Sequence, residues 1–450
     1  MPSIQYGLSA FERAEGDLPQ LPVINLYAEE APTESRGVVL QSRPALVDRG
    51  APRGSGPIQA LVQADGVYNE LPMTISGGVF YIGTTSWNTI TVTGPCSIAQ
   101  NDTGAMMTGG AEPWHFNGTT HTAVSFPDSA NVVKVIEGAS RFIALCEGSG
   151  KFYWTPPLGT TFDALDFATA ESEPDALYDA VFIKDMLILG GSQSIEFWPN
   201  TGDSSLPFQP LEGAVINRGV KATGCMTKYD ETFAWVCNDN TVRVGQQQQR
   251  ISNAGLEEKI EASTSTSLWT FELEGQEFLA LSIDAGTYVF GNRNRLWSQF
   301  QTYNQTRWEP CCYAGGIFGS SVDGTTFAWG DGYLDDSKPL ERRFRAGFPL
   351  DAGGMNIANL RLRVNPGQTS YLTGDYANPL IEMRTSRDGG QTFGDWRQTS
   401  LGAQGNYRKL IEWRGLGVAS RPGFLVEFRV TDPVPCRFSD VMVNTGFGGR

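Results

Sequence analysis

A two-strand pattern recurs along the first three quarters of the chain. An apolar run is followed by a turn rich in Gly, Asn, Asp and Ser, and then by a run rich in aromatic and β-branched residues. The clearest copy, FIALCEGSGKFYW, occupies residues 142–154. Each copy predicts a β-hairpin, because the turn residues tolerate positive φ and the flanking runs favour strands. The other copies begin at Met73, Met106, Leu187, Phe233, Phe278 and Ile317.

The spacing of these hairpins predicts the architecture. From residue 142 onward the copies start 39–46 residues apart, and a hairpin that recurs at this period is typical of one four-stranded blade per repeat. We therefore predict an all-β protein that contains a β-propeller of about seven blades, with six to eight as the allowed range. A helix of about two turns is expected at residues 253–262, within a connection between blades.

The repeat fades after residue 335, and the strands that follow have no 45-residue period. Alternating runs at residues 359–364 and 424–430 predict a separate β-sandwich-like domain. The expected division is an N-terminal arm at residues 1–35, the propeller at residues 36–340, and the β-sandwich-like domain at residues 341–450. The arm is irregular, apart from a strand candidate at residues 23–27, and we expect it to dock on a neighbour or to close the ring of blades.

Composition agrees with an all-β protein that lacks a membrane anchor. Gly accounts for 52 of 450 residues, above the usual ~7 %, which suits many tight turns. No apolar stretch reaches the ~18 residues of a membrane helix, and the N-terminus has no pattern of a secretory signal. The seven cysteines are odd in number and form no CxxC pair, so we expect reduced thiols.

The net charge of −15 argues against a general nucleic-acid binder, since such proteins need a basic surface to displace counterions. It is compatible with a protein that surrounds DNA without gripping it. Residues 342–345 (RRFR) form the one dense basic cluster. A solvated strand face or a salt bridge at a subunit interface is the favoured interpretation, with a contact to DNA phosphate as the alternative.

Motifs for catalysis are scarce. The chain has two histidines, His115 and His121, and contains neither a G-x-S-x-G nor an H-E-x-x-H sequence. A zinc site or a Ser-His-Asp triad would have to use one of these histidines, and we assign both a structural or surface role. We expect no catalytic residue, no metal site and no cofactor site, and we predict that the protein is not an enzyme.

The sharpest local motif lies in the C-terminal region and matches the Asp-box pattern S-x-D-x-G-x-T-[WF]. Such a turn lets the Asp accept backbone N–H groups while Gly adopts positive φ. The motif is known from sialidases, but its role there is structural, so we predict a structural turn. Its residues are Ser386, Asp388, Gly390, Thr392 and Phe393.

Four stretches resemble the tail hub proteins of short-tailed bacteriophages, also called packaged-DNA stabilisation proteins or tail accessory factors. They are residues 21–32, with the core NLYAE at 25–29; residues 40–46 (LQSRPAL); residues 191–202 (GSQSIEFWPNTG); and a C-terminal run that joins residues 386–393 to residues 407–417 and 429–433. The order of these stretches spans nearly the whole chain. Ala45 departs from the Gly expected after the Pro of the second stretch.

The resemblance implies a structural virion protein of a phage tail. Such a protein forms a ring, expected to be a hexamer, below the portal and the head-completion adaptor. It retains packaged double-stranded DNA, which passes through without sequence-specific binding, and it carries tailspikes or fibres and the distal plug or needle. Assembly would take place in the host cytoplasm. The alternative from another class is a carbohydrate-active (sialidase-like or capsule-degrading) or glycan-binding β-propeller, which rests on the Asp box and on the fold alone.

Overall fold

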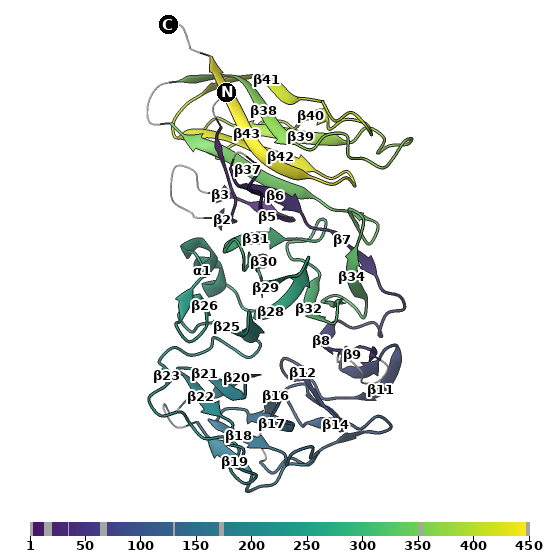
Figure 1. The fold of residues 1–450 in the computed structure, drawn as a ribbon, viewed down its shortest axis with the longest axis vertical. Coiled ribbons are helices and arrows are strands. Elements are labelled where there is room, and N and C mark those ends of the chain that lie inside the picture. Colours follow the sequence, from purple (N-terminus) through teal and green to yellow (C-terminus); the bar gives the residue numbers. More distant parts are fainter. Residues whose placement is uncertain are drawn as a thin grey trace.

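Seven four-stranded antiparallel groups form the larger part of this computed structural model, which describes residues 3–12, 20–34, 36–63, 70–128, 131–170, 175–350 and 354–446. They surround a common centre in the lower part of Figure 1, below a second, layered region. Blades 1–6 run in chain order, and blade 7 takes its fourth strand from near the N-terminus. The strands are, blade by blade, β8 (Ile58–Val62), β9 (Met73–Ser76), β10 (Val79–Ile82) and β11 (Thr85–Thr89); β12 (Ser97–Asn101), β13 (Gly104–Thr108), β14 (Trp114–Phe116) and β15 (His121–Ala123); β16 (Val132–Gly138), β17 (Arg141–Cys146), β18 (Lys151–Trp154) and β19 (Phe167–Thr169); β20 (Leu177–Ile183), β21 (Met186–Gly191), β22 (Ile195–Pro199) and β23 (Val215–Ile216); β24 (Met226–Tyr229), β25 (Thr232–Val236), β26 (Val242–Val244) and β27 (Gln249–Arg250); β28 (Thr266–Leu273), β29 (Gln276–Ile283), β30 (Gly286–Gly291) and β31 (Leu296–Phe300); and β32 (Pro310–Ala314), β33 (Ile317–Ser320), β34 (Thr326–Gly330) and β7 (Ala45–Asp48).

The predicted hairpins are the second and third strands of these blades. The copy at residues 142–154 forms β17 and β18, with Ile143 opposite Trp154. The copy that begins at Leu187 forms β21 and β22, and the two weaker copies form the same hairpins of blades 1 and 2. The prediction of an all-β fold with about seven propeller blades is therefore confirmed.

The hairpin between the first and second strands of a blade is tighter. In blades 3–7 it turns through two residues that both have positive φ, as a type I′ turn requires. Such turns match the twist of the strands they join, so they hold each blade in register even without glycine. The paired residues are Ala139 and Ser140, Lys184 and Asp185, Asp230 and Glu231, Glu274 and Gly275, and Gly315 and Gly316.

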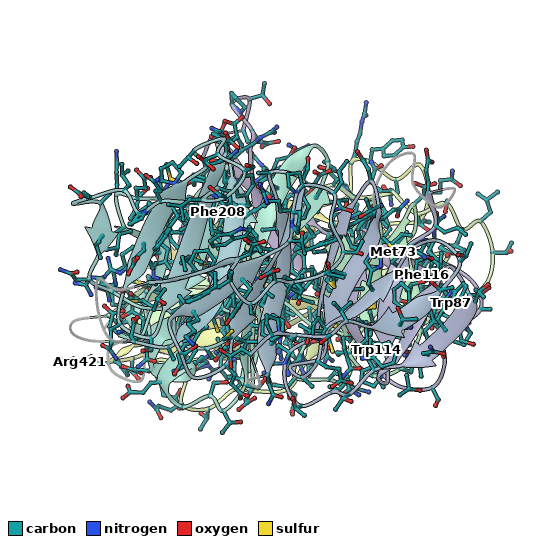
Figure 2. All side chains as sticks on the ribbon, turned by 90° about the horizontal axis from the view of Figure 1, so that it is seen from below. Met73, Trp87, Trp114, Phe116, Phe208 and Arg421 are labelled. Atoms are coloured by element: carbon teal, nitrogen blue, oxygen red, sulfur yellow. The ribbon has the colours of Figure 1, made fainter. Side chains whose placement is uncertain are left out.

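The propeller core lies between the faces of neighbouring blades. Between blades 1 and 2, for example, Met73, Phe80 and Phe116 are buried, and Trp87 and Trp114 pack against them (Figure 2). Similar apolar layers lie between the following pairs of neighbouring blades. Each blade therefore buries both of its faces, which explains why its strands read as nearly continuous apolar runs.

The ring of blades is closed by a strand from the start of the chain. β7 pairs with β34, with Leu46 opposite Trp329. Blade 7 thus joins residues that are about 280 positions apart, and the backbone hydrogen bonds between them prevent the first and last blades from separating. β35 (Leu334–Asp335) and β36 (Lys338–Pro339) follow as a short hairpin beside this closure.

The upper part of Figure 1 is a β-sandwich of two sheets, as predicted for the C-terminal region. Its core is a continuous apolar cluster between the sheets, which includes Leu360, Trp413, Phe428 and Val441. One sheet has the order β41-β38-β43-β6-β5, and the other has the order β4-β37-β42-β39-β40 with β1 beside β37. The strands are β1 (Gln5–Tyr6), β4 (Val23–Ile24), β5 (Leu26–Glu30), β6 (Val38–Ser42), β37 (Arg342–Pro349), β38 (Met355–Val364), β39 (Leu380–Ser386), β40 (Arg397–Ser400), β41 (Ile411–Ala419), β42 (Gly423–Val430) and β43 (Arg437–Gly446).

The propeller and the sandwich share a sheet. β4 pairs in parallel with β31 of blade 6, with Ile24 opposite Gln299, and on its other side it pairs with β37. The hydrogen-bonded ladder therefore runs from blade 6 into the sandwich. This continuity makes the junction stiffer than a flexible linker between two domains would be.

The expected division at residues 35 and 340 stays a prediction, but the strands cross its first boundary. β5 lies in the expected arm and pairs with β6, which in turn pairs with β43. Its apolar residues Leu26 and Ala28 belong to the sandwich core, so the described part of the arm from residue 20 to residue 34 is packed on its own chain. β2 (Phe11–Glu12) and β3 (Gln20–Leu21) form a small hairpin nearby.

The expected helix is present as α1 (Ala254–Glu261). Asn253 caps it by accepting a hydrogen bond from the Leu256 N–H at 3.0 Å, which satisfies one of the free donors of the first turn. Leu256 and Ile260 turn toward the apolar layer between blades 4, 5 and 6.

Candidate functional site

The centre of the propeller is a cavity of about 600 Å³ that the first strands of all seven blades line. Its lining mixes apolar residues with Gln59, Gln100, Lys134 and Glu137. Lys134 pairs across a blade boundary with the fully buried Asp179, whose carboxylate also accepts the backbone N–H groups of blade 5 at Gly224 and Met226. These charges tie neighbouring blades together, and they are not arranged as an acid, a base and a nucleophile.

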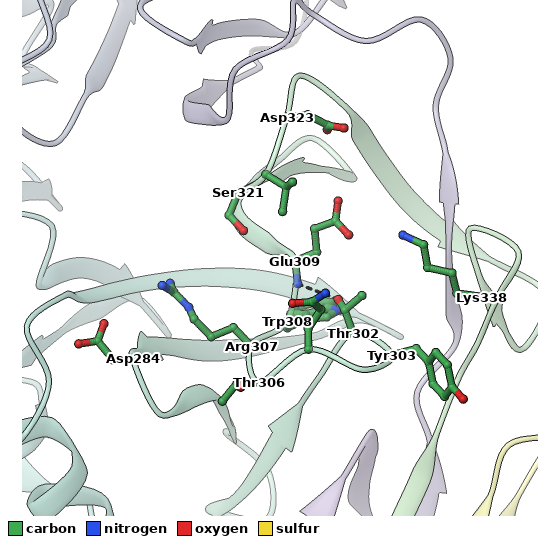
Figure 3. Close-up of a pocket in the computed structure, with 12 residues that line it drawn as sticks. Asp284, Thr302, Tyr303, Thr306, Arg307, Trp308, Glu309, Ser321, Asp323 and Lys338 are labelled. Carbon is green, nitrogen blue, oxygen red and sulfur yellow. Dashed lines mark hydrogen bonds between the residues drawn. The ribbon is translucent and has the colours of Figure 1, made fainter.

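A second cavity, of about 590 Å³, opens between blades 6 and 7 (Figure 3). Asp284, Glu309 and Asp323 line it together with Arg307 and Lys338, so it is the place where a pair of carboxylates for glycoside hydrolysis could be sought.

Asp284 and Asp323, two of the three carboxylates that line this cavity, accept hydrogen bonds from nearby hydroxyl and backbone N–H groups. Asp284 accepts hydrogen bonds from the hydroxyl and backbone N–H of Thr264, which lower the pKa of Asp284. Burial alone would raise the pKa of Asp323, but hydrogen bonds from Thr325 and Ser320 outweigh it and lower that pKa. A glycosidic acid needs a raised pKa, and these two carboxyl groups have the opposite shift.

Both histidines lie in the core between blades. The ring of His121 packs against Phe80 and Trp114, with centroids 4.9 and 5.0 Å apart, and that of His115 packs against Phe142. Neither ring nitrogen of His121 has a hydrogen-bond partner among the described residues. Burial, with a smaller contribution from His115, lowers the pKa of His121 to about 4. This environment suits a neutral packing residue.

The depressed pKa of His121 predicts a loss of stability in mild acid. The unfolded chain binds a proton below the ordinary pKa of about 6.5, whereas the folded chain resists protonation down to about 4. The stability that His121 contributes is therefore complete above pH 6.5 and is lost as the pH falls toward 4. We expect the free energy of unfolding to decrease by on the order of 2–3 kcal/mol across that range.

This dependence is measured by urea unfolding at pH 7 and pH 4.5 for the wild type and for His121→Phe, which keeps an aromatic ring against Phe80 and Trp114. The variant should lose most of the difference between the two pH values. His115, whose pKa burial also lowers, accounts for a residual slope. An equally steep dependence in the variant would contradict the assignment to His121.

The Asp-box residues begin at Ser386, the last residue of β39, continue into the connection to β40, and are joined by hydrogen bonds. Asp388 accepts from the Ser386 hydroxyl at 2.6 Å and from the Thr392 backbone N–H and hydroxyl at 3.0 and 2.6 Å. These bonds, the one from Ser386 first, lower the pKa of Asp388 to about 2. Gly390 adopts a positive φ of 97° and donates its N–H to Ser386. The structural role of this turn stays a prediction.

The aromatic end of the turn belongs to a stack on the outer face of the sheet. Phe393 lies between the guanidinium groups of Arg345 and Arg384, each 4.7 Å from its centroid, and Trp396 lies between Arg384 and Arg429 at 4.5 and 4.2 Å. We call these five residues the Arg–aromatic stack. Alternation of cations and rings is attractive because each ring presents a negative face.

A carboxylate beneath the stack, that of Glu427, balances part of its charge. The fully buried Glu427 accepts hydrogen bonds from Nε of Arg345 at 2.9 Å and from Nε of Arg384 at 2.5 Å, and Arg343 lies 3.9 Å away. Arg342 is buried and donates to the carbonyl oxygens of Val430, Asp432 and Val434. The basic cluster at residues 342–345 is thus engaged within its own chain.

A buried polar network joins the propeller to the sandwich. Arg43, which is fully buried, forms two bonds to the carboxylate of Asp335 at 3.0 and 2.5 Å, and its Nε donates to Asn25 at 3.0 Å. Asn25 has a positive φ of 54° and donates to the carbonyl oxygens of Gln301 and Glu341. Each of these groups is paired, so the network fixes the geometry of the junction without leaving a charge unsatisfied.

Local sequence patterns do not predict this junction, although two of its residues lie in stretches that the sequence comparison singles out. Asn25 belongs to the stretch NLYAE and Arg43 to LQSRPAL, two of the stretches that carry the resemblance to tail hub proteins. Asp335 lies about 290 residues further on, and no periodic signal links it to them. The available signal was the placement of an Arg and an Asn next to buried strand residues, where charged groups need partners.

No group of His, Cys, Asp and Glu residues suited to a metal ion occurs in the parts of the chain that the structure describes. All seven cysteines are free. Within the same described ranges, no helix is long and apolar enough to span a bilayer.

Comparison with known proteins shows a family likeness over most of the chain. A family model described as bacteriophage P22 Gp10, β-propeller, matches residues 6–324, and another described as bacteriophage P22 Gp10, β-sandwich, matches residues 343–446. Tail hub protein gp10 of Salmonella phage P22 is 21 % identical over 285 residues, which cover 57 % of this chain and 58 % of that relative. The match thus spans less than two thirds of the relative's length.

Solved structures also align with this chain, at low identity. BBS1N in complex with ARL6DN aligns with a TM-score of 0.43 and 9 % identity, covering 64 % of this chain and 98 % of its own. YCF48 from Cyanidioschyzon merolae has a TM-score of 0.41 and 10 % identity, covering 63 % and 98 %. At these values the likeness carries no argument about function.

Proposed function

Because the chain belongs to the bacteriophage P22 Gp10 family, we propose that it is a structural protein of a phage tail, the subunit of a hub ring. The ring, taken to be a hexamer, sits below the portal and the head-completion adaptor, continues the DNA channel and retains the packaged genome. It holds tailspikes or fibres and the distal plug or needle, and it assembles on the virion in the host cytoplasm.

The observation that carries this proposal is the stiff junction between the two β-regions. Two of the stretches that resemble tail hub proteins contain Asn25 and Arg43, which form the buried network with Asp335. In addition, β4 continues the sheet of blade 6 into the sandwich. A subunit that must transmit load along a tail needs a fixed angle between its parts, and a paired buried network supplies it. The division into residues 1–35, 36–340 and 341–450 is part of the proposal, as is a structural role for the Asp-box turn.

The net charge of the chain indicates how DNA would move through the channel of the ring. The chain carries a net charge of −15, which repels phosphate, so DNA can slide past the ring and is held back by a closing partner. We do not expect sequence-specific DNA binding or catalysis. The fold alone also fits glycan-cleaving propellers, but the hydrogen-bonded carboxylates Asp284, Asp323 and Asp388 give no support to that alternative.

The test uses DNA-filled phage heads that lack this chain. We expect added full-length protein to form a ring at the portal vertex in electron micrographs and to protect the genome from added nuclease. A matched sample is assayed for release of reducing sugar from host-surface glycans. Heads that stay unoccupied and leak, together with sugar release, would replace the tail-hub proposal by the carbohydrate-active one.

A further inference from the structure

Charge is divided unequally between the two parts of the chain. Residues 341–450 contain 15 Lys and Arg against 10 Asp and Glu, a net charge of +5, whereas residues 1–340 contain 19 against 39, a net charge of −20. The overall value of −15 therefore hides a basic sandwich attached to a strongly acidic propeller. Opposite fields on two parts of one molecule favour contacts between copies.

The free positive charge of the sandwich gathers at a groove of about 260 Å³ between β38 and the segment before β41. Arg361, Arg363, Arg408 and Lys409 line it, and no carboxylate belongs to its described lining. Arg361 contacts Glu412 at 3.0 Å. The other three cations have no ion pair within 4 Å in the described ranges, unlike the cations that surround Glu427. We call this surface the basic groove.

Two large apolar side chains stand beside these cations. Tyr407 is 62 % exposed and Leu410 is 64 % exposed, and both line the groove. Arginine next to exposed aromatic and aliphatic side chains is typical of a protein interface. Contacts to a DNA backbone use cations and polar donors and gain little from such apolar neighbours. The mixture therefore favours an acidic protein surface as the occupant.

The propeller provides such a surface where the first two strands of each blade turn. These turns lie on one face of the ring, because equivalent turns of a propeller share a face. Glu272 stands directly opposite Glu277 across the hairpin of blade 6, an arrangement that costs energy within one chain. We call this surface the acidic face. Its carboxylates are Asp102, Glu137, Asp185, Asp230, Glu231, Glu272 and Glu277, against the cations Lys184, Lys228 and the buried Arg141. Glu274, at the turn of blade 6, accepts the hydroxyl of Tyr27 from the chain's own sandwich.

We propose that the basic groove of one copy docks on the acidic face of the propeller of a second copy. This contact joins two different surfaces, so a rotation that closes produces a ring. The inference rests on the proposed function as a ring subunit and adds which surfaces meet. The groove residues Tyr407 and Leu410 become buried in the contact, and the free cations meet the carboxylates that oppose one another within a single chain.

Charge reversal on the full-length protein tests the contact, with copies bound per DNA-filled head and self-association in sedimentation as readouts. Arg363→Glu with Arg408→Glu reverses the groove, and Asp230→Lys with Glu272→Lys reverses the acidic face. Arg397→Glu with Arg421→Glu changes the sandwich by the same charge at exposed positions outside the groove. We expect each of the first two doubles to weaken association at least tenfold and the control double to leave it unchanged.

Mixing supplies the decisive result. The groove-reversed and face-reversed proteins should assemble together while each fails alone, because every interface then pairs opposite charges. If the groove-reversed protein forms rings like the wild type, the inference fails and the tail-hub function stands. If its defect is instead weaker binding of a 30-base-pair duplex, with no recovery on mixing, DNA is the occupant and the inference is wrong. A wild type that forms no ring on heads or in solution overturns the proposed function itself.

Discussion

Replacing Arg43 by Met should lower the free energy of unfolding by about 3–5 kcal/mol, because removing one member of a buried ion pair strands the other. Asp335 would keep the backbone N–H of Leu46 at 2.9 Å as a donor but would lose both guanidinium bonds. The side-chain oxygen of Asn25 would lose the Arg43 donor and keep only the Gln301 backbone N–H. The rings of Phe300 and Trp308 would lose the cation that lies 5.5 and 5.4 Å from them.

The loss at Arg43 is measured as the shift of the urea midpoint, together with limited proteolysis of the segment at residues 331–341. Lys184→Met is the matched control, since Lys184 forms an ion pair with Glu231 in which both side chains are more than 60 % exposed, and such pairs contribute about 0–1 kcal/mol. Arg43→Met combined with Asp335→Leu should recover part of the loss. Equal midpoints for Arg43→Met and Lys184→Met would show that the network does not hold the junction.

Replacing Glu427 by Gln should destabilise the sandwich by a similar amount, about 3–5 kcal/mol. The side chain is fully buried and lies within 4 Å of Arg343, Arg345 and Arg384. An amide keeps the shape but removes the negative charge, so the three guanidinium groups then repel one another at low dielectric. The Arg–aromatic stack should loosen as a result.

Tryptophan fluorescence reports this change, because Trp396 lies between Arg384 and Arg429 in the stack. Glu427→Gln should unfold at lower urea and show a shifted emission, whereas Glu231→Gln, at a side chain 81 % exposed, should do neither. Adding Arg384→Met to Glu427→Gln removes one of the stranded cations and should restore part of the stability. A Glu427→Gln protein as stable as the wild type would contradict the role assigned to the carboxylate.

Local patterns were sufficient to predict the blades but not all of their turns. The hairpin at residues 142–154 was visible because Gly148 and its neighbours mark a loop between two apolar runs. The first hairpin of blades 3–5 was not, since turns such as Lys184-Asp185 and Asp230-Glu231 place ordinary residues at positive φ. Packing of the flanking strands imposes that conformation, and turn composition does not reveal it.

Local sequence patterns could not predict which distant strands pair, for a different reason. β7 pairs with β34, and β4 pairs with β37 and β31. These partners are set by the positions of the sheet edges in the folded chain. The site showed the same limit: the Asp-box residues lie together as one local turn, whereas Asn25, Arg43 and Asp335 meet only after folding. The resemblance marked the stretches that contain Asn25 and Arg43 without indicating what they do.

The pairing of β6 with β43 has a consequence for the stage of synthesis at which the sandwich can fold. Gln41 pairs with Arg437, so this pairing cannot form until Arg437 has been synthesised. At ~5–20 residues per second, the ribosome needs about 20–80 s to extend the chain from residue 41 to residue 437. During that time the strands of Leu26, Val39 and Leu40, which are buried in the finished sandwich, lack the β43 strand that joins them to the rest of their sheet. A chain that ends before β43 cannot form this pairing, so β5 and β6 would stay unconnected to β38 and β41.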